Sequence, residues 1–403
     1  MPSPSIDGAT PQPAESDAGF GIYVHWPFCQ SKCPYCDFNS HVVRGVDQKA
    51  YAHALACELE WMAGETERKP VGSVFFGGGT PSLMEPATVE IVLNAIDRLW
   101  GLHQGVEISL EANPTSVEAA RFRDVAKLGV NRLSLGVQAM NDRDLKFLGR
   151  LHSSEEALRA IELARTHFPR LSFDLIYARP GQREADWAAE LQRALSYAVD
   201  HLSLYQLTIE EGTPFFELAR KGAFAIPEEE EAAGLYELTQ QLCEAAGLPA
   251  YEISNHARPG AECRHNLTYW RYGDYVGAGP GAHGRITRPG AHGRITRAGG
   301  KWATVTERMP TKWLATVTEK GHALVEEEEI TPQTSAEEML MMGLRLREGV
   351  SLNRFNSVSG RTLNADRLSF YEEKGLIEQR GGRLIATSQG RLVLNQLLGE
   401  LLV

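Results

Sequence analysis

Short apolar runs alternate along the chain with longer stretches in which apolar residues recur at helical spacing. The runs predict buried strands, and the stretches between them predict amphipathic helices. Such alternation is typical of a parallel sheet with helices packed outside it. The predicted strands are 21–26, 73–76, 106–111, 132–138, 171–177, 201–210 and 251–254, and the clearest predicted helices are 46–63, 116–128, 154–167 and 228–246.

Six or seven strand–helix repeats favour an α/β fold of the partial or full (β/α) barrel type over a small doubly wound sheet. Polar residues stand where the predicted strands end, and the carboxyl ends of barrel strands meet at one face, so a single site is expected there. These residues are the cysteines after the first strand, Gly77–Ser82 after the second, Glu111 and Asn113, Gln138, Asp174, and Tyr205 with Gln206.

The last 70 residues predict a small winged-helix-like α+β domain, because helical segments there precede a hairpin around Gly381-Gly382 and a final helix from Ser388. We therefore divide the chain into four parts. These are a disordered segment (1–19), the barrel (20–255), a linker region (256–333) and the C-terminal domain (334–403).

The region 265–300 is rich in glycine, arginine and aromatic residues and is interpreted as a loop. It contains the tandem repeat PGAHGRITR at 280–288 and 289–297. Two copies are too few for a solenoid, so a duplication within a tolerant loop is expected. A second interpretation pairs His283 with His292 as metal ligands.

Charge and hydropathy narrow the functional classes. The net charge of −11 and the lack of a dense Lys/Arg run argue against nucleic-acid binding. No apolar run reaches the roughly 18 residues that a transmembrane helix needs. The first 19 residues lack the basic start and apolar centre of a signal peptide, so a cytoplasmic location is expected.

Three of the six cysteines lie within eight residues, as Cys29-x3-Cys33-x2-Cys36, and Pro27 and Pro34 prevent a continuous helix around them. Such a loop can deliver three thiolates to one small group. Structural zinc needs a fourth ligand, for which His25 and His41 are candidates. An iron–sulfur cluster usually takes four cysteines, so three would leave one iron open to a substrate.

The cysteine spacing, followed one strand later by GGGTPS, resembles the signature of the radical S-adenosylmethionine (SAM) proteins. The resemblance implies a [4Fe–4S] cluster on Cys29, Cys33 and Cys36 whose open iron binds the amino and carboxylate groups of SAM. The cofactor then carries the chemistry and the protein positions it. The glycines suit this role because a backbone without Cβ atoms can approach a ligand closely.

The segments YVHWPFCQSKCPYCDFNS, FFGGGTPS, EANP, GVQ, LGRLH, DLIYARPGQ and SLYQLTIEEGTPF are similar to the branch related to oxygen-independent coproporphyrinogen III oxidase. The resemblance covers the chain from about residue 20 to its end. One departure is Ala178-Arg179, where Gly-Leu is usual, which places an extra charge near the cofactor face. The resemblance implies a SAM site formed by Tyr23, Gly78, Gly79, Thr80, Glu111, Gln138, Arg150 and Asp174.

Two features separate the oxidases of this branch from its haem chaperones. The oxidases have a fourth cysteine where this chain has Phe38, and a longer N-terminal segment where this chain has about 20 residues before its first strand. The sequence Arg264-His265-Asn266-Leu267-Thr268-Tyr269-Trp270 instead matches the HNxxYW motif of the chaperones.

These residue types suit haem. His265 can ligate iron, Tyr269 and Trp270 offer flat apolar area, and Asn266 can orient the imidazole. Cys263 is an alternative soft ligand, and a motif that only packs against the barrel is the competing interpretation. The resemblance thus implies a haem chaperone that passes haem to acceptor haem proteins, including membrane-associated respiratory enzymes. Oxidation of coproporphyrinogen III and a zinc-stabilised binding module remain alternatives.

Overall fold

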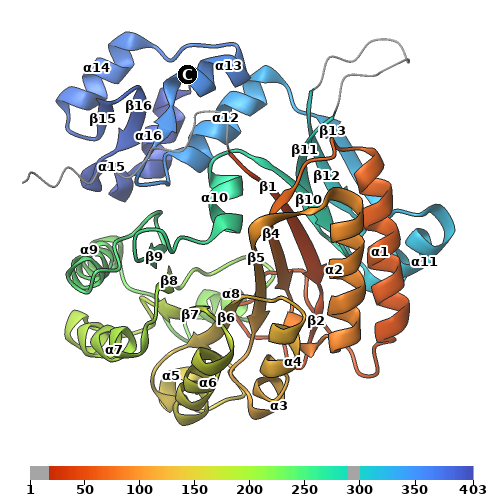
Figure 1. The fold of residues 1–403 in the computed structure, drawn as a ribbon. Helices are drawn as coiled ribbons and strands as arrows, with labels where there is room; N and C mark the ends of the chain where they lie inside the picture. Colours follow the sequence, from red (N-terminus) through yellow and green to blue (C-terminus); the bar gives the residue numbers. More distant parts are fainter. Residues whose placement is uncertain (1–17, 289–299, 403) are drawn as a thin grey trace, which may run out of the picture.

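The larger part of the molecule is one curved sheet whose central strands run parallel (Figure 1). The computed structural model describes residues 18–288 and 300–402. The strands follow the order β10-β1-β4-β5-β6-β7-β8, and each neighbouring pair is parallel. Their bounds are β1 (Phe20–Trp26), β4 (Val71–Gly78), β5 (Leu102–Ala112), β6 (Arg132–Gln138), β7 (Arg170–Tyr177), β8 (His201–Gln206) and β10 (Asp274–Ala278).

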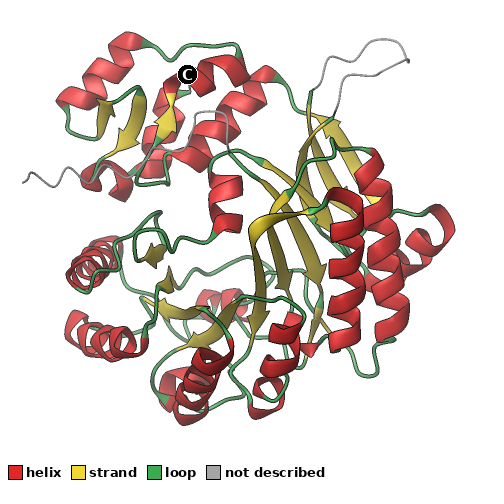
Figure 2. Ribbon diagram, viewed as in Figure 1, coloured by secondary structure: helices red, strands yellow, loops and turns green. Residues whose placement is uncertain are grey.

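Helices pack on the convex face of this sheet, as the alternating pattern predicts (Figure 2). The apolar residues of each strand that point outward, such as Leu133, Leu135 and Val137 of β6, are buried against them. The covering helices are α1 (Gln48–Gly64), α2 (Pro86–Trp100), α3 (Ser116–Ala119), α4 (Phe122–Lys127), α5 (Asp142–Phe147), α6 (Ser154–His167), α7 (Glu184–Tyr197) and α9 (Glu229–Ala245).

The barrel does not close. The sheet ends at β9 (Asn255–Ala257), antiparallel to β8, on one side. On the other side it continues from β10 into an antiparallel extension of β11 (His283–Thr287), β12 (Lys301–Thr306) and β13 (Leu324–Glu329). The partial form of the predicted barrel is therefore confirmed. The predicted strand 251–254 is wrong, since β9 begins only at Asn255, after the predicted strand has ended.

The loop interpretation of 265–300 is also wrong for its described residues, which contain α10 (Arg264–Trp270), β10 and β11. The glycines that suggested a loop allow close strand pairing instead. A Cβ on Gly277 would lie 2.2 Å from the carbonyl oxygen of His283, and one on Gly284 would lie 2.5 Å from the Thr304 hydroxyl. His283 is exposed on β11, whereas the second repeat copy, with His292, lies outside the described residues.

The C-terminal residues form a second, smaller unit with its own apolar core, which includes Leu340, Phe355 and Leu384. Its hairpin of β15 and β16 forms the predicted wing beside the helices, and β14 adds a third strand. The elements are α12 (Pro332–Gly343), β14 (Val350–Ser351), α13 (Leu352–Ser359), α14 (Ala365–Glu373), β15 (Ile377–Arg380), β16 (Arg383–Ala386), α15 (Ser388–Leu392) and α16 (Leu394–Leu401).

Other elements are short or peripheral: β2 (Phe28–Cys29), β3 (His41–Val42), a 3-10 turn (Pro81–Leu83), α8 (Pro214–Arg220) and α11 (Pro310–Lys320). The predicted disordered segment falls almost wholly on residues 1–17, outside the described part of the chain. Across 18–288 and 300–402, no helix is long and apolar enough to cross a membrane.

Candidate functional site

The cysteine loop leaves β1 and folds back on itself before α1 begins. Phe28 and Cys29 pair in parallel with His41 and Val42, so the residues between these two short strands must wrap around. A tight turn closes the loop, in which the Cys36 amide donates to the Cys33 carbonyl at 3.1 Å. All three thiols are half-buried and line the same pocket, as the spacing predicts.

The glycine-rich turn after β4 packs directly against this loop. The Gly79 amide donates to the Trp26 carbonyl at 2.7 Å, and the Thr80 amide donates to the Phe28 carbonyl at 2.9 Å. A Cβ on Gly79 would lie 2.7 Å from the carbonyl carbon of Pro27, and Gly78 has a φ of 110°. Glycine is therefore required here to bring two backbone segments together at the pocket edge.

The pocket that these segments enclose has a volume of about 150 Å³. It contains all three cysteines and every predicted SAM residue except Tyr23. Its lining also includes Tyr35, Phe38, Asn113, Ser134 and Gly136. Of these, Asn113 was suggested by its place at a strand end. Ser134 could have been found from the inward-facing positions of β6, whereas Tyr35 carries no comparable signal.

Two cysteines accept hydrogen bonds from the opposite wall of the pocket. The Thr80 hydroxyl donates to Cys29 Sγ at 3.5 Å, and Arg150 Nη1 donates to Cys33 Sγ at 3.3 Å. Burial raises the pKa of the Cys29 thiol, and the bond from Thr80 opposes this shift. Since thiolates are the species that bind iron, the bond from Thr80 favours the ligating state of Cys29.

Arg150 is itself held in place by β5 and β6. Its Nη2 donates to the Gly136 carbonyl at 2.8 Å and also to the Asn113 side-chain oxygen. Asn113 in turn donates to the Thr80 hydroxyl at 3.2 Å. One connected set of bonds thus fixes the arginine, the asparagine and the glycine-rich turn around the cysteines.

Two carboxyl groups, from Glu111 on β5 and Asp174 on β7, lie deeper in the pocket. Glu111 accepts from the Gly78 amide at 3.1 Å, and Asp174 accepts from the Ser134 hydroxyl at 3.3 Å. Burial, with the neighbouring Asp174 charge, raises the pKa of Glu111 to about 8, and burial raises the pKa of Asp174 to about 6. Neither forms an ion pair within the described residues, so a ligand with hydroxyl groups and a positive charge complements them.

Tyr23 lies beneath the pocket instead of on its surface. Its hydroxyl shares a hydrogen bond of 2.9 Å with His25 Nδ1, and His25 Nε2 bonds to the Asn39 carbonyl at 3.0 Å. This pair therefore joins the barrel interior to the cysteine loop. Gln138 does reach the pocket, in the left-handed conformation (φ 73°) that side chains seldom adopt and that clusters at functional sites.

The structure accommodates Ala178 and Arg179, which stand where Gly-Leu is usual, outside the lining of the pocket. Ala178 adopts a positive φ of 56°, which explains why glycine suits this position. Arg179 is buried and pairs with Glu190 and, at 3.2 Å, with Asp144. Its charge is therefore neutralised, and it does not line the cofactor pocket.

The HNLTYW residues form helix α10, which lies inside the open barrel and against the C-terminal domain (Figure 1). The His265 ring stacks on Phe75 at 4.6 Å between centroids and on Tyr23 at 5.8 Å, and it is 7% exposed. Burial lowers its pKa to about 3. Tyr269 packs beside Trp270, with 4.6 Å between their centroids. The four predicted haem residues thus lie together, but away from the cysteine pocket.

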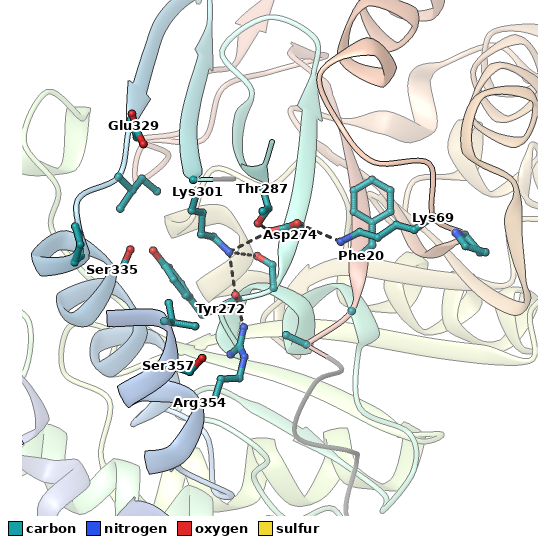
Figure 3. A pocket seen from close by; sticks show the side chains of 18 residues that line it. Phe20, Lys69, Tyr272, Asp274, Thr287, Lys301, Glu329, Ser335, Arg354 and Ser357 are labelled. Atoms are coloured by element: carbon teal, nitrogen blue, oxygen red, sulfur yellow. Dashed lines mark hydrogen bonds and ion pairs between the residues drawn. The ribbon is translucent and has the colours of Figure 1, made fainter. Parts of the chain in front are cut away.

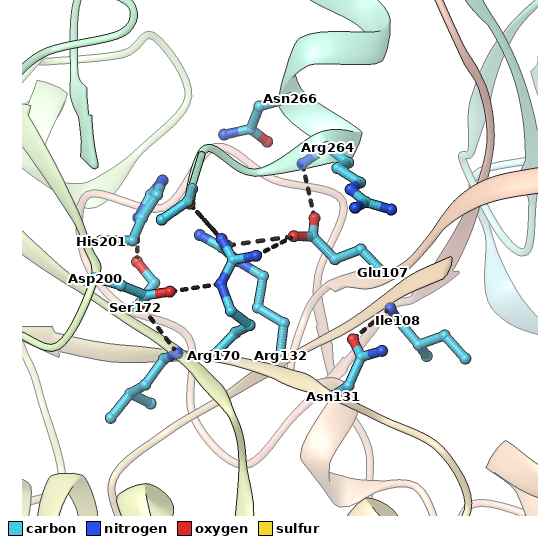
Figure 4. A network of polar contacts seen from close by, with 12 residues as sticks. Glu107, Ile108, Asn131, Arg132, Arg170, Ser172, Asp200, His201, Arg264 and Asn266 are labelled. Carbon is cyan, nitrogen blue, oxygen red and sulfur yellow. Dashed lines mark hydrogen bonds and ion pairs between the residues drawn. The ribbon is translucent and has the colours of Figure 1, made fainter. Parts of the chain in front are cut away.

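An ion-pair network anchors the start of α10 to the amino-terminal end of the barrel (Figure 4). The Arg264 amide donates to Glu107 at 2.7 Å, and Glu107 pairs with buried Arg132 at 3.3 Å. Arg170 bridges Asp200 at 2.5 Å and the Ala261 carbonyl. We call this set, Glu107, Arg132, Arg170 and Asp200, the barrel floor.

A second cavity, of about 770 Å³, lies between the sheet and the C-terminal domain (Figure 3). Lys69, Lys301 and Arg354 line it, with Asp274 among them. Lys301 donates to the Tyr272 carbonyl at 3.0 Å and to Asp274 at 3.2 Å, and Arg354 donates to the same carbonyl at 2.9 Å. Lys301 and Arg354 thereby fix the backbone at Tyr272, just after α10.

These features define a radical SAM protein: the partial barrel, the three-cysteine loop, the glycine-rich turn and the two neighbouring carboxyl groups. The sequence model of the radical SAM superfamily matches residues 23–194, and that of the HemN C-terminal domain matches 330–393. The chain belongs to the HemW family. It is 34% identical to "Heme chaperone HemW" of Bacillus subtilis over 94% of this chain and 98% of that protein.

Two further relatives are informative. The mitochondrial "Radical S-adenosyl methionine domain-containing protein 1" of Mus musculus is 40% identical, over 86% of this chain and 78% of that protein. Among solved structures, coproporphyrinogen III oxidase (HemN) of Escherichia coli matches with a TM-score of 0.76 and 22% identity, covering 95% of this chain and 90% of that chain. The oxidase similarity establishes the fold. Membership of the radical SAM superfamily implies a [4Fe–4S] cluster and SAM.

Proposed function

We propose that this protein is a haem chaperone, which binds haem and transfers it to acceptor haem proteins from a radical SAM core. The observation that carries the proposal is its similarity to HemW along nearly the whole of both chains. The cysteine loop agrees with it. Phe38, which replaces the fourth cysteine of the oxidases, is 64% exposed at the pocket and offers no thiol.

In this proposal Cys29, Cys33 and Cys36 hold the [4Fe–4S] cluster. The seven predicted residues that line the pocket, from Gly78 to Asp174, contact SAM, and Tyr23 supports the cysteine loop from beneath through His25. When bound, the cluster and SAM together supply one-electron chemistry. Arg150 and Thr80 donate hydrogen bonds to the sulfur atoms of Cys33 and Cys29 and hold them at the pocket wall. Glu111 and Asp174 accept hydrogen bonds from hydroxyl groups of the ligand and balance its positive charge.

The predicted haem residues, His265, Asn266, Tyr269 and Trp270, impose a structural condition. His265 lies against Phe75 inside the barrel, so ligation of haem iron by His265 requires α10 to move. The cavity of Figure 3 offers room for a porphyrin without that movement. Lys69, Lys301 and Arg354, which share this lining with Asp274 and Glu329, supply positive charge for the propionates of haem. We propose that haem first docks in this cavity, beside the end of α10.

A haem titration of the anaerobically reconstituted protein tests the function, read from the Soret band. We expect saturable binding, weakened in His265→Ala but not in the control His53→Ala, whose side chain is exposed on α1. Ser357→Trp, which fills the cavity, should also weaken binding, unlike Thr318→Trp on the exposed side of α11. If wild-type protein shows no saturable Soret band, the proposed function is wrong.

Oxidation of coproporphyrinogen III is the second candidate, favoured by the fold similarity to HemN. Incubation of the reconstituted protein with SAM, reductant and coproporphyrinogen III distinguishes the two. We expect no protoporphyrinogen IX and no release of carbon dioxide, because a cysteine of the oxidases is missing at Phe38. Formation of that product at catalytic rates would favour the oxidase. A cytoplasmic location and respiratory acceptors, including membrane-associated ones, belong to the same proposal.

A further inference from the structure

A line of polar side chains runs through the barrel interior from α10 to the SAM pocket. It begins on α10 and continues through the segment before β9. From there its members alternate between β8 and β7. Its members are Asn266, Tyr251, His201, Ser172, Ser203 and Asp174. The part of it near α10 is visible in Figure 4, where Asn266, His201 and Ser172 are labelled.

The links nearest α10 are short. Asn266 Nδ2 donates to the Tyr251 hydroxyl at 3.0 Å, and that hydroxyl lies 3.0 Å from His201 Nε2. His201 Nδ1 lies 2.7 Å from the Ser172 hydroxyl. His201 is 2% exposed, and burial followed by the Arg132 charge keeps its pKa well below the usual value, so the ring is neutral.

The upper links reach the cofactor pocket. The Ser172 and Ser203 hydroxyls are 3.5 Å apart, which is the longest step of the chain. Ser203 and Asp174 are register partners on β8 and β7, and a hydrogen bond from Ser203 stabilises the Asp174 carboxylate. Asp174 lines the SAM pocket, so the chain joins α10 to a predicted ligand of SAM.

The Asp174 end of this chain sets the direction of its bonds. The Asp174 carboxylate can only accept, so Ser203 gives it the single proton of its hydroxyl. Ser172 must then donate to Ser203 and accept from His201 Nδ1. A neutral imidazole has one protonated nitrogen. His201 accepts from Tyr251 at Nε2 and must carry its proton at Nδ1.

We propose that this directed chain couples the seating of α10 to the SAM pocket, with Asn266 and Tyr251 as positioning residues for Asp174. Ser203 holds the Asp174 carboxylate in the orientation that a SAM hydroxyl needs, and a hydrogen bond from SAM to Asp174 changes the bond from Ser203 and, through it, the chain down to Asn266. The proposal rests on SAM binding, which the superfamily implies, and not on haem binding.

The carboxyl-terminal end of α10 contacts the C-terminal domain. The Arg345 guanidinium lies 4.6 Å from the centre of the Trp270 ring, and Arg271 pairs with Glu348 at 2.8 Å. The helix therefore lies between the SAM pocket and the second domain. Because coupling between sites is reciprocal, whatever moves α10 must also change the affinity for SAM.

Nitrogen NMR of the reconstituted protein tests the direction of the chain. We expect His201, identified among the 12 histidines by its loss in His201→Gln, to show a protonated Nδ1 and an unprotonated Nε2. Addition of SAM should shift the Nδ1 resonance. A His201 ring protonated at Nε2 would reverse the chain and overturn the proposal, as would a spectrum that SAM leaves unchanged.

Equilibrium SAM binding tests the coupling. Tyr251→Phe removes one link and should weaken SAM binding by roughly three- to tenfold, the worth of one buried hydrogen bond. The matched control is Thr66→Val, which removes the bond of 2.9 Å from Trp100 Nε1 far from the pocket and should leave SAM affinity unchanged. If Tyr251→Phe does not fold, Ser203→Ala breaks the chain nearer Asp174. Wild-type affinity in these chain variants, or an equal loss in Thr66→Val, would reject the coupling.

Discussion

The two ends of the barrel interior treat charge in opposite ways. At the carboxyl end, Glu111 and Asp174 are buried beside one another, and neither has an ion-pair partner in the described chain. At the amino end, Glu107 is buried and Asp200 is largely covered, but Arg132 and Arg170 pair with them.

This difference indicates that the carboxyl end is a binding site and that the amino end stabilises the fold. Unpaired buried carboxyls cost stability until a ligand complements them, whereas a paired set fixes the strands and α10 in position. Substitutions at the carboxyl end should therefore change ligand binding more than folding. Substitutions in the barrel floor should change folding more than ligand binding. The following predictions test this contrast in order of decreasing effect.

The largest effect is expected at the cysteines. Replacing Cys29, Cys33 or Cys36 by Ala should abolish the cluster, since the loop supplies only three thiolates and the cluster needs all of them. Iron and sulfide analysis after anaerobic reconstitution measures this, with Cys57→Ala on the exposed side of α1 as the control. Full iron content in any of the three variants would remove that cysteine as a ligand.

In the barrel floor, Arg132→Met should lower the free energy of unfolding by about 3–5 kcal/mol, because Glu107 keeps its buried charge without its closest ion-pair partner. Denaturant unfolding measures the loss. SAM affinity of the folded fraction should stay near the wild-type value. A variant of unchanged stability with weakened SAM binding would invert the comparison.

At the carboxyl end, Arg150→Met should weaken SAM binding by about ten- to hundredfold, since a hydrogen bond to a charged group contributes about 1.5–3 kcal/mol. The measurement is equilibrium binding to the reconstituted protein. Arg159→Met, which removes only an exposed pair with Glu155 on α6, is the control. Equal affinities in the two variants would contradict the role given to Arg150.

The raised pKa of Glu111 predicts a pH dependence with a definite sign. The unfolded carboxyl loses its proton near pH 4.5, whereas the native one keeps it until about pH 8, so apoprotein stability should fall as pH rises through that window. SAM affinity should rise over the same range, because the ligand binds the carboxylate. Thermal unfolding from pH 5 to 9 checks this. Glu111→Gln should flatten the stability profile, and an unchanged profile would assign it to another group.

The smallest effect is expected at Phe38. Its ring is 64% exposed, so Phe38→Ala should change unfolding free energy by less than about 0.5 kcal/mol. Cluster content should also be unchanged, as iron analysis can verify. A loss of cluster would mean that this ring shields the iron despite its exposure.

Much of the cofactor end could be predicted from the sequence, because its residues follow strands whose order is sequential. Gly78 and Gln138 end β4 and β6, Glu111 is next to the end of β5, and Asp174 lies within β7, on successive parallel strands whose carboxyl ends must meet at one edge. Tyr35 and the bonds of Arg150 could not be predicted, since they depend on how the cysteine loop folds back.

The amino end and the region after residue 255 were harder to predict. Glycine is typical of loops, but Gly277 and Gly284 lie in paired strands, where the absence of a Cβ allows close approach. Helix α10 was interpreted as a loop because seven residues carry too little periodicity. The burial of His265 depends on a helix inserted into the open barrel, which no local pattern encodes.

The most direct test of the central claim is electron paramagnetic resonance of the reduced, anaerobically reconstituted protein, with and without SAM. We predict about four irons per chain and the signal of a reduced [4Fe–4S] cluster, shifted when SAM binds the iron that lacks a cysteine. A colourless protein with one zinc ion, or a cluster signal that SAM does not change, would contradict the claim that these three cysteines hold an open cluster.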